Sequence, residues 1–196
     1  MSNRHAPVVA DIALFAAPFI YLRHGETTSN RDEIIAGSLD VELTDQGRAQ
    51  AAEAGRRLAT LGLSTGPVVT SSRRRARDTA MIVAGALGHI VTDLIVLPDL
   101  DERNWGALEG RPRRERRPDA LPADLETLEA FHARTARALA AIAPAGGQRL
   151  PLVVAHSGTW RVLCRLTGVT AAATPVGNAL PIRVAPEGDC WRADPL

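Results

Sequence analysis

The chain has 196 residues, enough to bury the core of one sizeable domain, and its 45% hydrophobic residues exclude a disordered chain. A net charge of +1 argues against general affinity for nucleic acids or anionic membranes. Two cysteines, Cys164 and Cys190, are too few for a disulfide framework, so we expect a cytoplasmic protein. The apolar stretch over 6–17 is interrupted by Asp11 and followed by Pro18, which is a poor pattern for a secretory signal or a membrane span.

The first half of the chain alternates short apolar runs with longer helical stretches. The apolar runs predict strands, and the stretches between them predict helices. Thr44 is placed to cap the first helix, Gly62 to end it, and Gly88 to end the second. In chain order, the predicted elements are a strand over 19–22, a helix over 45–61, a strand over 67–70, a helix over 73–87 and a strand over 91–97.

A loop rich in arginine, proline and glycine, over 101–122, begins the second half. It is followed by a helix over 124–142, a strand over 150–155, a helix over 157–167 and strands near 179–185 and 189–193. This alternation predicts an α/β fold, a three-layer sandwich with a mostly parallel central sheet and helices on both faces. We expect one domain over 1–196, with an N-terminal extension over 1–18 that packs on it and a short cap loop over about 106–125.

Ionisable residues follow four of the predicted strands. Arg23 and His24 follow the first strand, residues 71–75 the second, Glu102 the third, and His156 the strand over 150–155. Ligands of open α/β sheets bind beyond the carboxyl ends of the strands, and the helix after His156 points its positive end there. The sequence therefore predicts one shared pocket that binds an anion.

The adjacent Arg23 and His24 suit attack on phosphorus. The guanidinium can hold a charged phosphoryl group while the imidazole accepts it. A neutral imidazole must then present one free nitrogen. We therefore expect the other nitrogen of His24 to donate to a backbone carbonyl, such as that of Gly25.

The order of these motifs resembles that of the histidine phosphatase superfamily, which includes cofactor-dependent phosphoglycerate mutases and many small phosphatases. The resemblance covers most of the chain, from about Phe19 to Trp191. The matching segments are RHGET at 23–27, Asn30, Gly37, Asp40, LTDQG at 43–47, Gln50-Ala51, TSSRRRARDTA at 70–80, an acid loop LDERNWG at 100–106 ending in Glu109-Gly110, and VVAHSG at 153–158.

The resemblance implies a role for each matching residue. His24 is the nucleophile that forms a phosphohistidine, and Arg23, Arg75 and His156 surround the phosphoryl oxygens. Glu102 protonates the leaving alkoxide and then activates the attacking water, help that is worth about 10²–10⁴-fold in general acid catalysis.

Neutral groups complete the phosphate site that the resemblance implies. Asn30, the backbone around Gly37, and Ser157 are expected to bind the phosphoryl group or substrate. These donors add hydrogen bonds without adding further charge.

Other roles are open for several of these residues. His156 could be a buried histidine at a strand end, and Glu102 could belong to a solvated acidic loop. Arg75 competes with three other arginines on the same helix start, and alignment on Thr79-Ala80 selects it. Arg73 stands where the family usually has an apolar residue. Either its stem packs and its guanidinium points outward, which we expect, or it adds charge to the rim of the pocket.

The arginine run Arg111–Arg117 lies on the loop after the acid residue. It is either a solvated face or a patch that attracts a substrate with several negative charges. Trp105 either forms the floor of the substrate site or packs beneath the loop. His5, His89 and His132 are interpreted as structural or surface residues.

The function predicted from these observations is a metal-independent phosphomonoesterase with a small phosphorylated substrate and no cofactor. No metal is expected, because His24 and His156 lack neighbours at ligand spacing and arginines supply the positive charge. The alternatives are a phosphoglycerate mutase, which the short cap disfavours, and a non-catalytic phospho-ligand-binding module. Nucleic-acid binding by the arginine run is weaker, because the chain has no overall positive charge. Natural substrate and oligomeric state are left open by the sequence.

Overall fold

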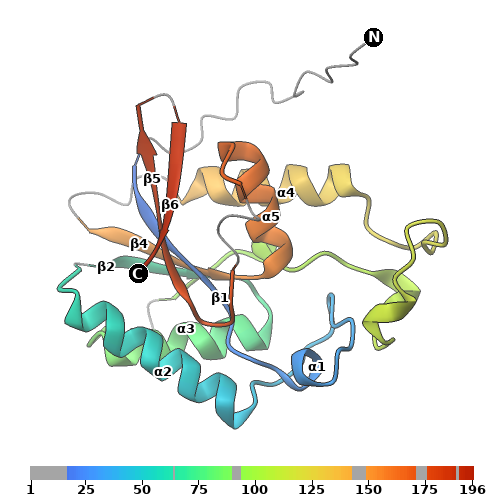
Figure 1. Ribbon diagram of the computed structural model, residues 1–196, viewed down its shortest axis with the longest axis horizontal. Helices are drawn as coiled ribbons and strands as arrows, with labels where there is room; N and C mark the ends of the chain where they lie inside the picture. Colours follow the sequence, from blue (N-terminus) through green and yellow to red (C-terminus); the bar gives the residue numbers. More distant parts are fainter. Residues whose placement is uncertain (1–16, 64, 90–93, 143–148, 171–175, 189) are drawn as a thin grey trace.

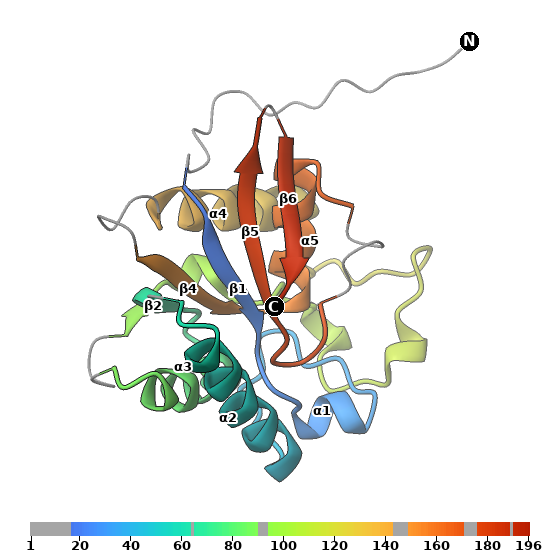
Figure 2. The ribbon, with the colours of Figure 1, turned by 60° about the vertical axis from the view of Figure 1, so that its left-hand side comes forward.

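The computed structural model describes residues 17–63, 65–89, 94–142, 149–170, 176–188 and 190–196. Figure 1 shows their arrangement in layers, and Figure 2 shows the sheet from another side. The strands are β1 (Phe19–Arg23), β2 (Thr65–Thr70), β3 (Ile95–Val96), β4 (Leu150–Ala155), β5 (Pro181–Glu187) and β6 (Cys190–Pro195). The α-helices are α1 (Thr28–Arg31), α2 (Asp45–Thr60), α3 (Arg74–Ala86), α4 (Leu128–Ala141) and α5 (Ser157–Thr167). Short 3₁₀ turns are η2 (Pro98–Leu100), η3 (Gly106–Leu108) and η4 (Arg113–Glu115).

The strands form one sheet in the order β3-β2-β4-β1-β5-β6. The pairs β3–β2, β2–β4 and β4–β1 are parallel, whereas β5 and β6 add an antiparallel hairpin beside β1. In the register of the sheet, Arg23 lies opposite Ala155, and Thr70 lies opposite Val154. The segments that follow β1, β2 and β4 therefore leave the sheet side by side.

Both faces of the sheet are covered, and β1 shows why. Ile20 and Leu22 are fully buried in a core with residues of α2 and α3. The alternate residues Phe19 and Tyr21 are buried in a second core with residues of α4 and α5. A strand that is hidden on both faces is apolar throughout, and this explains the continuous run that predicted it. The predicted three-layer α/β sandwich with a mostly parallel sheet is confirmed.

Two elements, α4 and β3, differ most from their predicted bounds. Helix α4 starts at Leu128 rather than at 124, because Thr127 caps it by accepting from the backbone N–H of Ala130 at 3.1 Å. Asp124 instead accepts from the backbone N–H of Ala107 at 3.2 Å and so belongs to the cap loop. Strand β3 has two residues and stops before Pro98, where η2 begins; residues 91–93 of its predicted span lie outside the described part.

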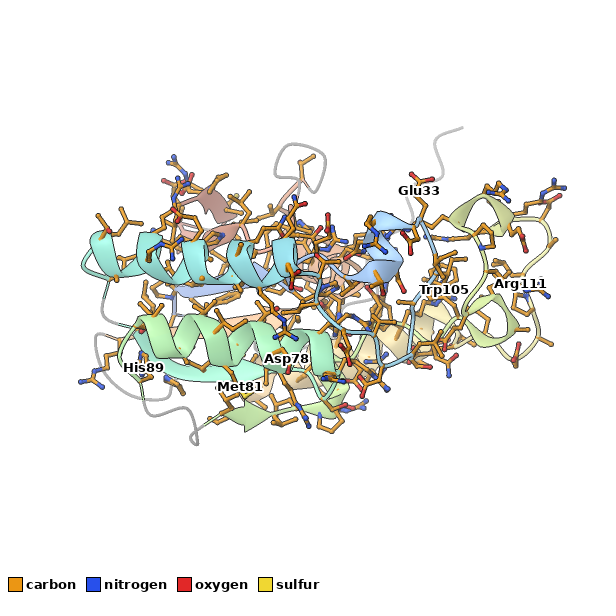
Figure 3. All side chains as sticks on the ribbon, turned by 90° about the horizontal axis from the view of Figure 1, so that it is seen from below. Glu33, Asp78, Met81, His89, Trp105 and Arg111 are labelled. Atoms are coloured by element: carbon orange, nitrogen blue, oxygen red, sulfur yellow. The ribbon has the colours of Figure 1, made fainter. Side chains whose placement is uncertain are left out.

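The cap loop, residues 106–125, is tied to the segment that follows α1. The backbone N–H of Ile35 donates to the carbonyl of Arg111 at 2.8 Å, and that of Arg113 donates to the carbonyl of Glu33 at the same distance. Figure 3 shows Trp105 and Arg111 at one end of the molecule and His89 at the other. The predicted N-terminal extension lies outside the described residues up to residue 16. No helix in the described residues is long and apolar enough to span a membrane.

Candidate active site

A cavity of about 870 Å³ lies where the segments after β1, α1, β3 and β4 come together. Of the eight residues predicted for the site, those that line the cavity are Arg23, His24, Asn30, Gly37, Arg75, Glu102 and Ser157. The eighth, His156, does not line it, but its ring centroid lies 5.3 Å from that of His24. The fold therefore gathers residues that are up to 134 positions apart in the sequence, from Arg23 to Ser157.

His24 directly follows β1, and its side chain is 5% exposed. Its Nδ1 lies 2.7 Å from the carbonyl oxygen of Gly25. Burial, and then the charges of Arg75 and Arg23, hold the pKa of His24 well below its ordinary value, so the ring is neutral near pH 7. Because a carbonyl can only accept, Nδ1 carries the single proton and Nε2 keeps its lone pair. This is the form of histidine that can act as a nucleophile.

His156 follows β4 and is fully buried. Its Nε2 lies 2.7 Å from Oγ of Ser71, and that oxygen also accepts from the backbone N–H of Arg73 at 3.3 Å. Burial and the charge of Arg75 hold the pKa of His156 well below its ordinary value. The hydroxyl of Ser71 can donate to Nε2 or accept from it, and the tautomer of the ring follows from that direction. Nδ1 is buried and has no hydrogen-bond partner in the described residues.

Arg23 is the last residue of β1 and presents an unsatisfied donor. Its Nε is buried and has no hydrogen-bond partner within the described part of the chain, while Nη1 lies 3.4 Å from the carbonyl of Val176. Burial lowers the pKa of Arg23, and the charge of Glu102 opposes that change. A buried donor without a partner costs free energy, and a bound anion would remove that cost.

Arg75, in the first turn of α3, is 1% exposed. It donates from Nη1 to the carbonyl of Leu39 at 2.7 Å and from Nη2 to that of Gly37 at 2.8 Å. Burial lowers the pKa of Arg75 to about 10, which leaves the guanidinium charged near pH 7. The structure places Arg75 at the cavity and exposes its neighbours Arg74 and Arg77.

Glu102 lies between η2 and η3, and backbone donors hold both of its carboxylate oxygens. Oε1 accepts from the N–H of Arg103 at 2.9 Å, and Oε2 accepts from the N–H of Gly158 at 3.0 Å. A Cβ at position 158 would lie 1.9 Å from Oε1. Because Gly158 has no side chain, the carboxylate of Glu102 can reach the start of α5. The sequence motif alone did not indicate this role of Gly158.

Neutral residues complete the wall of the cavity. The amide oxygen of Asn30 accepts from the backbone N–H of Thr27 at 3.2 Å and from Nδ2 of Asn178 at 3.3 Å. Gly37 has a φ of +50°, and a Cβ there would lie 2.2 Å from Oε1 of Glu109. Ser157, the first residue of α5, also lines the cavity.

Arg134 of α4 is a residue that the sequence reasoning missed. It donates to three backbone carbonyls around the acid residue, those of Asp99, Asp101 and Glu102, at 3.0, 2.7 and 3.1 Å. It also forms a two-point ion pair with Glu126, at 2.6 and 2.9 Å. An arginine within a helix resembles any surface arginine in sequence, so no sequence signal marks this role.

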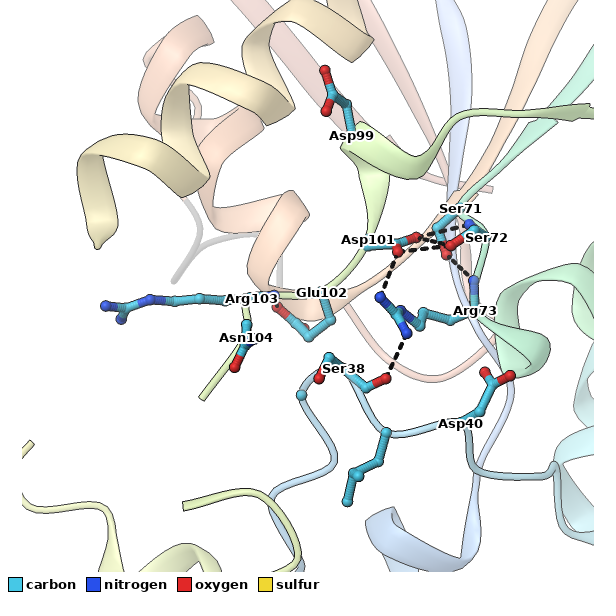
Figure 4. A network of polar contacts seen from close by, with 12 residues as sticks. Ser38, Asp40, Ser71, Ser72, Arg73, Asp99, Asp101, Glu102, Arg103 and Asn104 are labelled. Atoms are coloured by element: carbon cyan, nitrogen blue, oxygen red, sulfur yellow. Dashed lines mark hydrogen bonds and ion pairs between the residues drawn. The ribbon is translucent and has the colours of Figure 1, made fainter. Parts of the chain in front are cut away.

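Arg73 does not point outward, as the sequence had predicted. Its Nη2 pairs with Asp101 at 2.8 Å, and its Nη1 donates to the carbonyl of Ser38 at 2.6 Å (Figure 4). Asp101 also accepts from the backbone N–H and hydroxyl of Ser72. Arg73 is drawn inward because the acid loop places a buried carboxylate beside the start of α3. It links that loop to Ser38 and is not among the residues that line the cavity.

The outer wall of the cavity contains residues whose roles were left open. Arg113 and Arg116 of the arginine run line it, together with Trp105 and Arg161. Trp105 is 8% exposed, so it both packs beneath the loop and borders the cavity.

The three histidines interpreted as structural or surface residues differ from one another. His132, in the first half of α4, is half-buried and lines the cavity. His89 lies 2.6 Å from the hydroxyl of Thr65, and His5 is outside the described residues. Across the described ranges, no three His, Cys, Asp or Glu side chains gather as a metal site requires.

Comparisons with known proteins agree with the motifs and the fold. The model of the histidine phosphatase superfamily (branch 1) matches residues 19–194. Phosphoglycerate mutase-like protein 4 of Arabidopsis thaliana is 34% identical over 163 residues, which are 75% of this chain and 69% of that protein. Fructose-2,6-bisphosphatase TIGAR B of Danio rerio is 44% identical over 94 residues, which are 47% of this chain but only 36% of that protein.

A similar solved structure is a mycobacterial glucosyl-3-phosphoglycerate phosphatase in complex with VO3. It superposes with a TM-score of 0.74 and 26% identity, covering 91% of this chain and 98% of the other. The likeness thus extends over nearly the whole of both chains. The resemblance inferred from the motifs is confirmed: the chain belongs to branch 1 of the histidine phosphatase superfamily.

Proposed function

We propose that the protein is a metal-independent phosphomonoesterase that hydrolyses a small phosphorylated metabolite through a phosphohistidine on His24. The observation that carries this proposal is the buried, neutral imidazole whose Nδ1 is held by the carbonyl of Gly25 at 2.7 Å. Its Nε2 has no hydrogen-bond partner among the described residues, and the ring lies in a cavity bordered by Arg23 and Arg75. The free thiols of Cys164 and Cys190 are compatible with action in a reducing cytoplasm.

The phosphoryl group binds first. Nε–H of Arg23 is a buried donor without a partner in the described residues, and it gains an acceptor when a phosphoryl oxygen reaches it. The guanidinium of Arg75 adds charge beside it. Charge-assisted hydrogen bonds of this kind are about twice as strong as neutral ones.

In the first chemical step, Nε2 of His24 attacks phosphorus. The N–P bond forms as the P–O bond to the leaving group breaks, and Glu102 gives its proton to the leaving oxygen. The products are an alcohol, a phosphohistidine and the carboxylate of Glu102. The donors from Arg103 and Gly158 keep that carboxylate in place for the next step.

In the second step, the carboxylate of Glu102 takes a proton from a water molecule as the water oxygen attacks phosphorus. The O–P bond forms and the N–P bond breaks, which releases phosphate. His24 returns to its neutral form and Glu102 to its protonated form. No redox partner or metal takes part in this cycle.

Acid-quench labelling tests the proposal directly. The wild-type protein and His24→Ala are incubated with ³²P-labelled phosphomonoesters under chelator and then quenched. We expect an acid-labile, base-stable phosphoenzyme in the wild type only, and a loss of turnover of about 10⁴-fold or more in the variant. Absence of that phosphoenzyme in the wild type contradicts the mechanism and favours a non-catalytic phospho-ligand binder. Loss of activity on chelation contradicts metal independence.

A phosphoglycerate mutase is a second candidate, because basic residues line the outer cavity and one relative is named phosphoglycerate mutase-like. The two activities differ in which molecule receives the phosphoryl group. The test measures interconversion of 2- and 3-phosphoglycerate and release of phosphate, with and without a bisphosphate primer. Phosphate release faster than interconversion supports the phosphatase, and the reverse order supports the mutase.

A further inference from the structure

The cavity has far more positive than negative charge. Its arginines are Arg23, Arg75, Arg103, Arg113, Arg116 and Arg161, whereas Glu102 is the single carboxylate among the described residues that line it. In the proposed function, Arg23 and Arg75 serve the phosphoryl group. The other four arginines exceed what one phosphoryl dianion can neutralise.

Three of these arginines form the rim of the cavity, namely Arg113, Arg116 and Arg161. All three are exposed, and none takes part in an ion pair with a described residue. They come from η4 and the segment after it, and from α5, so two separate parts of the chain place cations at one opening. The less exposed Arg73 and Arg134 pair instead with Asp101 and Glu126.

Trp105 holds one rim arginine in place. The guanidinium carbon of Arg116 lies 4.0 Å from the centroid of the Trp105 ring, and that of Arg103 lies 4.9 Å from it. The backbone N–H of Trp105 donates to Glu109 at 2.9 Å, and Glu109 also accepts from the backbone and hydroxyl of Ser38. Stacking on a fixed aromatic face restricts Arg116 to positions near the cavity.

The proximity of these cations is unfavourable in the empty site. After burial, the charges of Arg161 and Arg103 are the causes that lower the pKa of Arg116. An anion bound among them would relieve this repulsion. Part of the cavity wall is apolar and includes Ile34, Leu128 and Phe131. Its volume, about 870 Å³, suits an organic ligand much larger than phosphate alone.

We propose that the substrates are phosphomonoesters with a second anionic group, a phosphate or a carboxylate, which the rim arginines bind while the phosphoryl group lies at His24. This proposal rests on the phosphatase function proposed above and names its substrate class. The apolar wall contacts the carbon skeleton that joins the two anionic groups.

Matched substrate pairs test the proposal by kcat/KM. Glycerol 3-phosphate is compared with 3-phosphoglycerate, which replaces a hydroxymethyl group by a carboxylate. Fructose 6-phosphate is compared with fructose 1,6-bisphosphate, which adds a phosphate. We expect the wild type to prefer the doubly anionic member of at least one pair by about 10-fold or more, and the pair identifies the second group.

Two double variants separate direct binding of the second anionic group from the general electrostatic attraction of the arginine-rich loop. Arg113→Ala/Arg116→Ala removes two charges that line the cavity. Arg114→Ala/Arg117→Ala removes two exposed charges from the same run that do not line it. We expect the first variant to lose the preference by about 10-fold, mainly through KM, and the second to keep it within about twofold. No preference in the wild type, or an equal loss in both variants, overturns the proposal.

A binding measurement keeps this test independent of turnover. Calorimetric titration of His24→Ala with 3-phosphoglycerate and with fructose 1,6-bisphosphate reports the rim even if no phosphohistidine forms. Affinity that falls about 10-fold when Arg113→Ala/Arg116→Ala is added supports the rim site. Unchanged affinity for both ligands contradicts it. A failure of the phosphoenzyme assay with intact rim binding refutes only the phosphatase mechanism.

Discussion

The floor and the rim of the cavity are built in opposite ways. The floor, formed by Arg23, His24 and Arg75, lies at the end of β1 and the start of α3, and backbone carbonyls hold its side chains. The rim arginines are exposed and lack carboxylate partners in the described residues. Rigid parts of the fold thus position the proposed reaction, whereas substrate selection depends on side chains that can change without loss of the core.

Glu102 lines the same cavity. Among the replacements of residues around the nucleophile, that of Glu102 is expected to slow the reaction most. Glu102→Gln keeps the shape but removes the proton. We expect kcat/KM for an alkyl phosphate to fall by about 10²–10⁴-fold, and for p-nitrophenyl phosphate by much less, because its phenolate leaves without protonation. Phosphohistidine should accumulate with the aryl substrate. Equal losses of kcat/KM for both substrates rule out the assigned role.

Arg134 acts on the site indirectly, because it donates to the backbone carbonyls around Glu102. Arg134→Ala is expected to lower kcat/KM for an alkyl phosphate by about 10- to 100-fold, and by less for p-nitrophenyl phosphate, since misplaced Glu102 matters most for a poor leaving group. Urea unfolding should show a loss of about 2 kcal/mol, because Glu126 and three carbonyls lose their donor.

The matched control for this positioning role is Arg137→Ala on the same helix. Arg137 pairs with Asp99 at 3.1 Å, but its side chain is 64% exposed. An exposed ion pair contributes less than about 1 kcal/mol, so both activity and stability should change little. If Arg134→Ala slows both substrates to the same extent, Arg134 supports the fold without positioning Glu102.

The last prediction concerns the dependence of stability on pH. Burial holds the pKa of both His24 and His156 below the ordinary value of about 6.5, which the unfolded chain regains. Below that pH the unfolded state binds more protons, so the unfolding free energy falls as pH falls, by up to about 1.4 kcal/mol per unit for each histidine. The unfolding free energy, measured with urea at several values between pH 5 and 7, should depend less steeply on pH in His24→Gln than in the wild type. An equally steep pH dependence in both proteins contradicts the lowered pKa of His24.

Local patterns were sufficient to predict much of the fold and the choice of site residues. Apolar runs located the strands, Thr44 capped α2 as expected, and the ends of parallel strands brought His24 and Glu102 to one cavity. Where the prediction was wrong, a distant contact decided the outcome. Arg73 points inward because it pairs with Asp101. Asp124 accepts from the backbone N–H of Ala107 and does not start α4.

By itself, the sequence determined the order of strands and helices and the family, because apolar periodicity and short motifs act over a few residues. Only the tertiary structure decided which nitrogen of His24 is free, which arginines lack a carboxylate, and that Arg134 supports the segment around Glu102. These features depend on contacts between residues far apart in the chain. Whether a charged group is buried, paired or exposed is settled by such contacts and not by its neighbours in sequence.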